Sequence, residues 1–120
     1  MRLGAMIDTP ASAVIADTLA PEVDFFIADS DSLLRLTLAA DPQDGAVSDI
    51  LRKHPTAAVR LIGYATRALH ESGKGKQMGA FGDLAAEKSL TERFIDLGVD
   101  FLSIPPPYVL EMREKIRSCP

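Results

Sequence analysis

The sequence contains one cysteine, no tryptophan and few aromatic residues, and these shortages limit what the chain can be. The single cysteine, Cys119, excludes an internal disulfide framework and favours a reducing compartment, so we expect a cytoplasmic protein. No stretch approaches the roughly 18 consecutive apolar residues that cross a membrane, and no basic segment followed by a long hydrophobic one opens the chain. We therefore expect neither a membrane partner nor a secretion signal.

A concentrated basic surface is also missing. The net charge is −4, and the 13 Lys and Arg residues are scattered along the chain. Because binding of a polyanion needs a dense field of positive charge, we expect no nucleic-acid partner. What is present is an ordinary globular composition of 120 residues, 47% hydrophobic and 25% charged, which predicts a single domain over residues 1–120.

Four short apolar runs indicate β-strands, and each is followed by a pattern typical of a helix. The runs lie at residues 2–7, 23–28, 77–81 and 99–104. The second is almost continuously hydrophobic, which is typical of a strand that is covered on both faces in a parallel sheet. The step at residues 99–117 is a weaker copy of the step at 23–38, so the sequence suggests a repeated architecture.

The helical segments are bounded by capping residues and turn formers. Thr9 and Pro10 fit the N-cap and first position of a helix that we expect to reach Leu19. Residues 41–45 form a loop of turn formers, and residues 46–53 could hold a short helical turn. The remaining helices are predicted at residues 33–38, 58–72, 84–97 and 108–117.

About four βα units result, and they predict an α/β fold with parallel strands and right-handed crossovers. Two architectures fit this pattern. One is a small, open, doubly wound sheet that is complete in a single chain. The other is half of a TIM-type (βα)8 barrel, whose unpaired edge strands would invite a second half, as in a homodimer.

Carboxylates accumulate where the predicted strands end. Asp8, Asp29, Asp31 and Asp83 follow the first three strands, and both architectures place ligands at the carboxyl ends of parallel strands. Oxygen ligands at one rim suit Mg²⁺, which takes one or two protein carboxylates beside water and phosphate oxygens. Capping of the following helices is the simpler interpretation of the spacing alone, since Asp, Ser and Thr are expected at such turns in any case.

Five segments carry a more specific signal through their order and spacing. They are Gly-Ala-Met-Ile-Asp-Thr-Pro at 4–10, Val-Asp-Phe-Phe at 23–26, Thr-Leu-Ala-Ala-Asp at 37–41, His-Pro at 54–55, and Gly-Ala-Phe-Gly-Asp-Leu-Ala at 79–85. Together they resemble the C-terminal region of the phosphoenolpyruvate-utilising enzymes. This family includes enzyme I of the bacterial sugar phosphotransferase system, pyruvate phosphate dikinase and phosphoenolpyruvate synthase. The resemblance covers nearly the whole chain.

The resemblance implies a βα barrel that binds phosphoenolpyruvate with Mg²⁺ and passes its phosphoryl group to a histidine on a separate domain. The chain corresponds to the last four βα units of that barrel. It therefore resembles a half-barrel that contains neither the phosphohistidine domain nor the phosphate-binding arginines of the first half. The implied setting is a sugar phosphotransferase system and sugar transport.

The resemblance also assigns site positions, several of which hold unusual residues. Asp8 stands where the family has a metal-binding glutamate. An Asn-Asp pair of the family falls on Asp31 and Ser32, so the metal acid is lost or displaced by one residue. Asp31 and Gly79 take positions of substrate contacts, and Pro42 stands where the family has a phosphate-binding arginine.

The family's catalytic cysteine, the general acid that protonates the enolate, falls on Phe81. Phenylalanine has no proton to give, and Asp83 is the only acid within two residues that could act instead. We expect a catalytically degenerate pseudoenzyme when the chain is alone. Two alternatives remain: a working part that binds phosphoenolpyruvate and Mg²⁺ when a second polypeptide completes the barrel, and an interaction module without a ligand.

Overall fold

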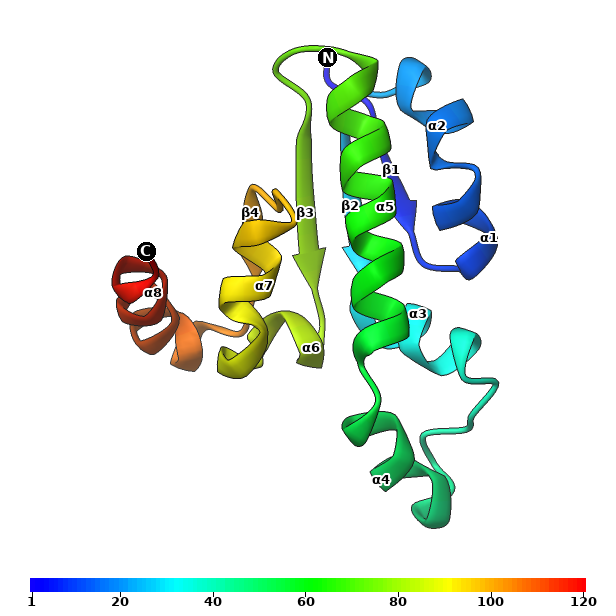
Figure 1. Cartoon of the computed structure of the whole chain (residues 1–120), viewed down its shortest axis with the longest axis vertical. Coiled ribbons are helices and arrows are strands. Elements are labelled where there is room, and N and C mark those ends of the chain that lie inside the picture. The colour runs from blue at the N-terminus through cyan, green and yellow to red at the C-terminus, as the bar shows by residue number, and fades with distance from the viewer.

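A computed structural model describes all residues 1–120 and contains one sheet of four parallel strands (Figure 1). The strands are β1 (Gly4–Ile7), β2 (Phe25–Asp29), β3 (Gln77–Phe81) and β4 (Phe101–Ser103). Their order in the sheet is β1-β2-β3-β4, the same as along the chain. A doubly wound sheet would reverse its strand order at a switch point, whereas a βα barrel adds strands in sequence. The fold is therefore that of half a TIM-type barrel.

Eight α-helices and three 3₁₀-helices connect and follow these strands. They are α1 (Pro10–Val14), α2 (Ala16–Leu19), η1 (Ala20–Glu22), α3 (Ser30–Thr37), α4 (Gly45–Lys53), α5 (Thr56–Ser72), α6 (Asp83–Ala86), η2 (Lys88–Leu90), α7 (Thr91–Asp96), η3 (Pro106–Tyr108) and α8 (Val109–Ser118). None of these helices combines the length and the apolarity that a membrane crossing demands.

The core lies between the sheet and the helices on one of its faces. Side chains alternate along each strand, and those facing the helices are buried, namely Ile7, Phe26, Ala28, Met78 and Ala80. The long helix α5 lies along this face in Figure 1 and contributes a buried stripe at helical spacing. Val59, Ile62 and Leu69 belong to that stripe. Burial of these side chains holds the helices on the sheet.

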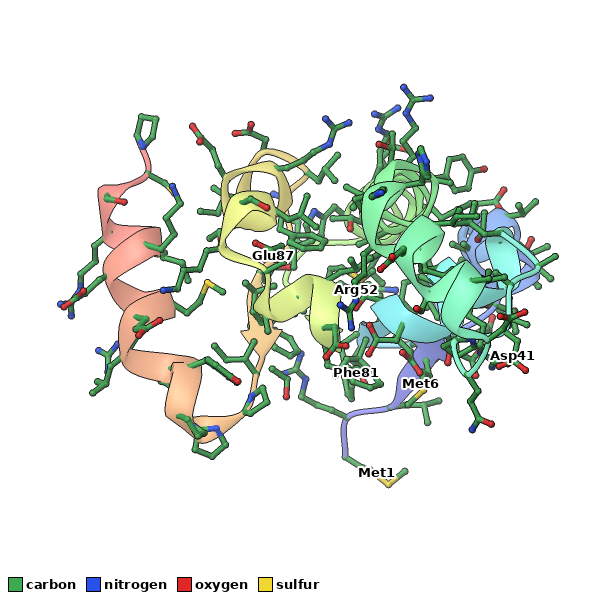
Figure 2. All side chains as sticks on the ribbon, turned by 90° about the horizontal axis from the view of Figure 1, so that it is seen from below. Met1, Met6, Asp41, Arg52, Phe81 and Glu87 are labelled. Atoms are coloured by element: carbon green, nitrogen blue, oxygen red, sulfur yellow. The ribbon has the colours of Figure 1, made fainter.

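The opposite face of the sheet has no helical cover. Its apolar side chains are Met6, Phe25, Ile27, Phe81 and Phe101, which we call the open face. Met6 is 50% exposed and Phe101 is 40% exposed. In the end view of Figure 2, α5 and α7 lie on one side of the sheet, and the N-terminal segment that carries Met1 lies on the other. In a closed barrel, this face would point to the interior.

Two glycines let aromatic rings lie flat on the open face. A Cβ atom on Gly4 would lie 2.2 Å from the ring of Phe25 on the neighbouring strand, and one on Gly79 would lie 2.3 Å from the ring of Phe101. The register pairs the same residues, Gly4 with Phe25 and Gly79 with Phe101. The β1-β2 pair and the β3-β4 pair thus use the same packing.

The β1-β2 and β3-β4 pairs also share a hydrogen-bonding pattern where the paired strands begin. The carboxylate of Asp24 accepts a hydrogen bond from the Leu3 amide at 2.7 Å, and that of Asp100 accepts one from the Met78 amide at 2.7 Å. In each case the aspartate amide donates back to the same residue's carbonyl. These reciprocal contacts fix the register before the first ladder bond. Asp24 and Asp100 lie at corresponding places in the two βα steps that the sequence suggested to be alike.

Three helix predictions need correction. The single helix expected from Pro10 to Leu19 is wrong, because the chain breaks at Ile15, whose ψ of 17° leaves the helical region and separates α1 from α2. The helix predicted over residues 84–97 is likewise divided, since Glu87 is extended with ψ 110°. The short turn predicted at 46–53 is a helix of nine residues, α4, capped by the carboxylate of Asp44.

Candidate functional site

Four acids follow the strands at one end of the sheet, as the sequence predicted, but they have different environments. Asp8 comes directly after β1, is half-buried, and makes no hydrogen bond or ion pair with another side chain. Asp29 ends β2, Asp31 lies in the first turn of α3, and Asp83 opens α6. Asp31 contacts both Asp29 and Asp83, whereas Asp8 stands apart from the other three.

Asp29 is a cap. Its Oδ1 atom accepts hydrogen bonds from the amides of Asp31 and Ser32, each at 3.1 Å, at the start of α3. Its Oδ2 atom accepts the hydroxyl proton of Ser32 at 2.7 Å. The capping interpretation therefore holds for this acid. The hydroxyl of Ser32, to which the sequence resemblance assigns the position of a metal-binding acid, is hydrogen-bonded to Asp29 within the chain.

Asp31 joins the end of β2 to the end of β3. Its two carboxylate oxygens accept the Asp83 amide at 2.9 and 3.0 Å. Beside it, the buried Ser30 hydroxyl donates to the Phe81 carbonyl at 2.7 Å. Gly82 permits both contacts, because its φ is +103° and a Cβ there would lie 2.6 Å from the Ser30 oxygen. The rim is thus a connected network across two strands.

Burial raises the pKa of Asp31 above its usual value of 3.8. The charges of Asp83 and Asp29 raise this pKa further, while backbone hydrogen bonds from Asp83 and Leu84 lower it. The carboxylate is turned onto the α6 backbone even though the residue as a whole is exposed. This raised pKa marks the rim as an electrostatically unusual region of the chain.

The remaining predicted positions lie at or below this rim. Phe81 is the last residue of β3, half-buried, and lines a pocket with Asp83 and Tyr108. Asp83 is exposed there, within reach of that pocket. Gly79 lies lower, in mid-strand, where the ring of Phe101 covers it. The position predicted for the general acid thus carries a phenyl group, and the Phe101 ring lies over the predicted glycine contact.

The acids form no complete metal cage. No three His, Cys, Asp or Glu side chains converge as a possible metal site anywhere in the chain. Mg²⁺ is often held by only one or two protein carboxylates, with waters and ligand phosphates completing its octahedron. Asp8 and Asp31, which follow adjacent strands, fit a site with one or two protein carboxylates but do not form a complete set of protein ligands.

A pocket of about 260 Å³ opens beside this network, between α3, α4 and α6. Its lining combines both signs of charge with hydroxyl and apolar groups: Asp31, Ser32, Leu34, Arg35, Pro42, Ser48, Leu51, Arg52, Asp83 and Leu84. In Figure 2 the Arg52 side chain extends toward the part of the rim where Phe81 lies. No motif in the sequence marks Arg35 or Arg52, because they reach the same pocket only through the path of the loop at residues 41–45.

Comparison with known proteins identifies the origin of this arrangement. A family model described as "PEP-utilising enzyme, PEP-binding domain" matches residues 1–120. The chain belongs to this family. Relatives include phosphoenolpyruvate-protein phosphotransferases from Priestia megaterium, 35% identical over 117 residues, and from Staphylococcus carnosus (strain TM300), 33% identical over 118 residues. A third, from Streptococcus equinus, is 31% identical over 117 residues.

Each of these alignments covers 98% of the chain but only 20% of the relative. The chain therefore spans about a fifth of the length of these phosphotransferases. The family resemblance found in the sequence is confirmed. The PEP-utilising enzymes generally depend on Mg²⁺.

Proposed function

We propose that the chain is a half-barrel of the PEP-utilising family that requires a second half, and that it does not transfer phosphoryl groups when alone. The observation that carries the proposal is the open face, where large apolar side chains remain exposed on a sheet with two unpaired edges. Exposed apolar patches of this kind mark interaction surfaces, and free edge strands invite added strands.

A second copy of the chain is the simplest partner. Because all four strands are parallel and in sequential order, a twofold rotation about the barrel axis places β4 of one copy beside β1 of the other at both seams. The result is a closed ring of eight parallel strands. The open faces then meet inside the ring. One symmetric assembly thus buries the exposed apolar side chains and also pairs the free strand edges.

Sedimentation of the purified chain tests this pairing. We expect a dimer, and we expect Phe101→Glu to produce a monomer because a carboxylate would be buried in the barrel interior. Ile95→Glu is the matched control, since Ile95 is 39% exposed on α7, against 40% for Phe101. A wild-type chain that stays monomeric at every accessible concentration would refute the pairing.

The loss of catalysis follows from Phe81. Without a general acid at this position, protonation of the enolate loses a factor of about 10² to 10⁴ in rate. Asp83 is an exposed carboxylate one residue beyond the Gly82 turn, and it is the only acid within two residues of Phe81. We expect no pyruvate release from phosphoenolpyruvate by the chain in the presence of Mg²⁺. Measurable release that Asp83→Asn abolishes would contradict the proposal and assign the acid role to Asp83.

A second candidate function is binding of phosphoenolpyruvate with Mg²⁺ at the rim, for a partner that supplies the chemistry. The favouring observation is the unpartnered carboxylate of Asp8 at the end of the strand next to Asp31. Bound Mg²⁺ would neutralise phosphate charge, and the role of the chain would be to hold the ion and ligand at one rim. This would place the chain as a binding or regulatory component.

Calorimetric titration with phosphoenolpyruvate, with and without Mg²⁺, tests the second candidate. We expect Asp8→Ala to abolish the metal-dependent part of the binding. Asp17→Ala is the control, because Asp17 is exposed on α2 and belongs to no part of the rim. An affinity that Asp8→Ala leaves unchanged would remove Asp8 from the site.

A further inference from the structure

The pocket between α3, α4 and α6 contains two arginines with no acidic partner. Arg35 comes from α3 and Arg52 from α4, and both line the pocket. The chain has only two ion pairs, His70 with Asp100 and Lys88 with Glu111. Neither guanidinium donates a side-chain hydrogen bond to another residue. Their positive charge is therefore available to a ligand.

The acids of the pocket do not neutralise these arginines. The oxygens of Asp31 accept the backbone amide of Asp83, and Asp83 is not in ion-pair distance of any cation. Charges of both signs therefore share the lining, with Asp31 and Arg35 both on α3, and neither arginine is paired with an acid. The Ser32 and Ser48 hydroxyls lie on its lining, while Leu51 and Leu84 supply apolar surface.

We propose that this pocket binds a small phosphate-bearing anion through the guanidinium groups of Arg35 and Arg52. The planar fork of arginine binds phosphate and carboxylate oxygens in pairs, which makes it the preferred residue for such ligands. A volume of about 260 Å³ lies just below the usual range of small-molecule sites, so the ligand is limited to a few heavy atoms around its phosphate group.

The two arginines replace a charge that the chain has lost. Pro42 stands at the position of a phosphate-binding arginine of the family, and it lines the same pocket as Arg52. Neither Arg35 nor Arg52 is a position to which the family resemblance assigns a phosphate contact. The positive charge is thus supplied from α4 and α3 instead of from the loop after α3. This inference deepens the second candidate function and rests on its ligand class, although the pairing of half-barrels does not affect it.

Titration of the chain with inorganic phosphate, without Mg²⁺, tests the inference. We expect Arg52→Gln to weaken phosphate binding by about 10-fold to 100-fold, the usual cost of losing a hydrogen-bonded charge. Arg52→Lys keeps the charge but loses the paired geometry, so a smaller loss is expected. Arg60→Gln is the control, because Arg60 is exposed on α5 and does not line the pocket.

The outcomes separate this inference from the proposals above. Loss of phosphate binding in Arg52→Gln and Arg35→Gln, with Asp8→Ala unchanged in metal-free buffer, supports the arginine pocket. Absence of phosphate binding at millimolar concentration, or equal weakening by Arg60→Gln, overturns it. A phosphate site that persists in Asp8→Ala while the Mg²⁺-dependent binding of phosphoenolpyruvate is absent refutes the rim metal site alone. Circular dichroism of each variant checks that α4 remains folded.

Discussion

The β1-β2 pair and the β3-β4 pair of this half-barrel share the same contacts between strands, but their crossover helices bury side chains of different size. Both pairs place a phenylalanine ring over a glycine and fix their register with an aspartate. Between β1 and β2, however, the crossover buries only alanines from its helices, namely Ala13, Ala16 and Ala20. Between β3 and β4, the crossover buries Phe94 of α7 and Leu84 of α6. The same contacts thus recur in both strand pairs, whereas the volume of the buried helix side chains differs between the two crossovers.

The aromatic rings of the two pairs also differ in cover. The Arg2 guanidinium lies 5.7 Å from the centre of the Phe25 ring and hydrogen-bonds to Gln77 at 3.2 Å. No cation lies over Phe101, which is 40% exposed. The Phe101 ring is therefore the more accessible of the two rings. Replacements at corresponding positions test how far the two pairs are equivalent.

The largest effect is expected from Phe94→Ala. Phe94 is 1% exposed and is the only large buried side chain of α7, so its loss leaves a cavity under the second crossover. We expect a decrease of about 3–5 kcal/mol in the free energy of unfolding. Urea denaturation followed by circular dichroism measures it. Ile95→Ala, at the exposed neighbour, should cost far less, and equal costs would show that the crossover is not held by Phe94.

An intermediate effect is expected at the register aspartates. Asp100→Ala leaves the amide of the buried Met78 without its acceptor, which typically costs about 1–3 kcal/mol. Asp24→Ala should cost less, because Leu3 is exposed and water can reach its amide. Asp100→Asn should recover part of the loss, since its amide oxygen still accepts. Equal destabilisation by Asp24→Ala and Asp100→Ala, measured by denaturation, would contradict this difference between the pairs.

The smallest effect is expected at Asp31, in the turn after β2. The turn after β4 has no acid and contains Pro105 and Pro106 instead. Because the folded pKa of Asp31 is raised above 3.8, the folded state binds this proton more tightly than the unfolded state does. Its stabilising contribution is full below pH 3.8 and is lost as the pH rises through the folded pKa. Asp31→Asn cannot titrate.

Thermal unfolding of both proteins across this pH range tests the shift. The melting temperature of the wild type relative to Asp31→Asn should be highest at acidic pH and should fall toward neutral pH. Asp17→Asn is the control, because Asp17 is exposed on α2 and lies outside the rim. A difference that grows with pH instead would mean that the hydrogen bonds from Asp83 outweigh burial.

The strands and the cap residues could be predicted from the sequence because they depend on local information. The apolar run at 23–28 and the Asp29 cap are properties of neighbouring residues, and both lie where the pattern placed them, with β2 shifted at its start to Phe25. The choice between half-barrel and doubly wound sheet needed the strand order, which no local pattern encodes. The family resemblance supplied that choice from the sequence.

The site was only partly predictable for the same reason. The acids at the rim follow from their places after strands, but the contact of Asp31 with the Asp83 amide depends on the β2-β3 register and on the positive φ of Gly82. The arginine pocket depends on the path of the 41–45 loop, which returns α4 over α3. Side chains that meet through loops leave no periodic signal in the sequence.

The sequential strand order also has a consequence for how the chain is made. Each strand pairs with the strand synthesised before it, β2 with β1, β3 with β2, and β4 with β3. No strand has to wait for a segment beyond its successor in the chain, so the sheet can grow strand by strand in the order of synthesis. The β4 edge is completed last, and Phe101 is therefore presented only when the rest of the sheet can already be folded.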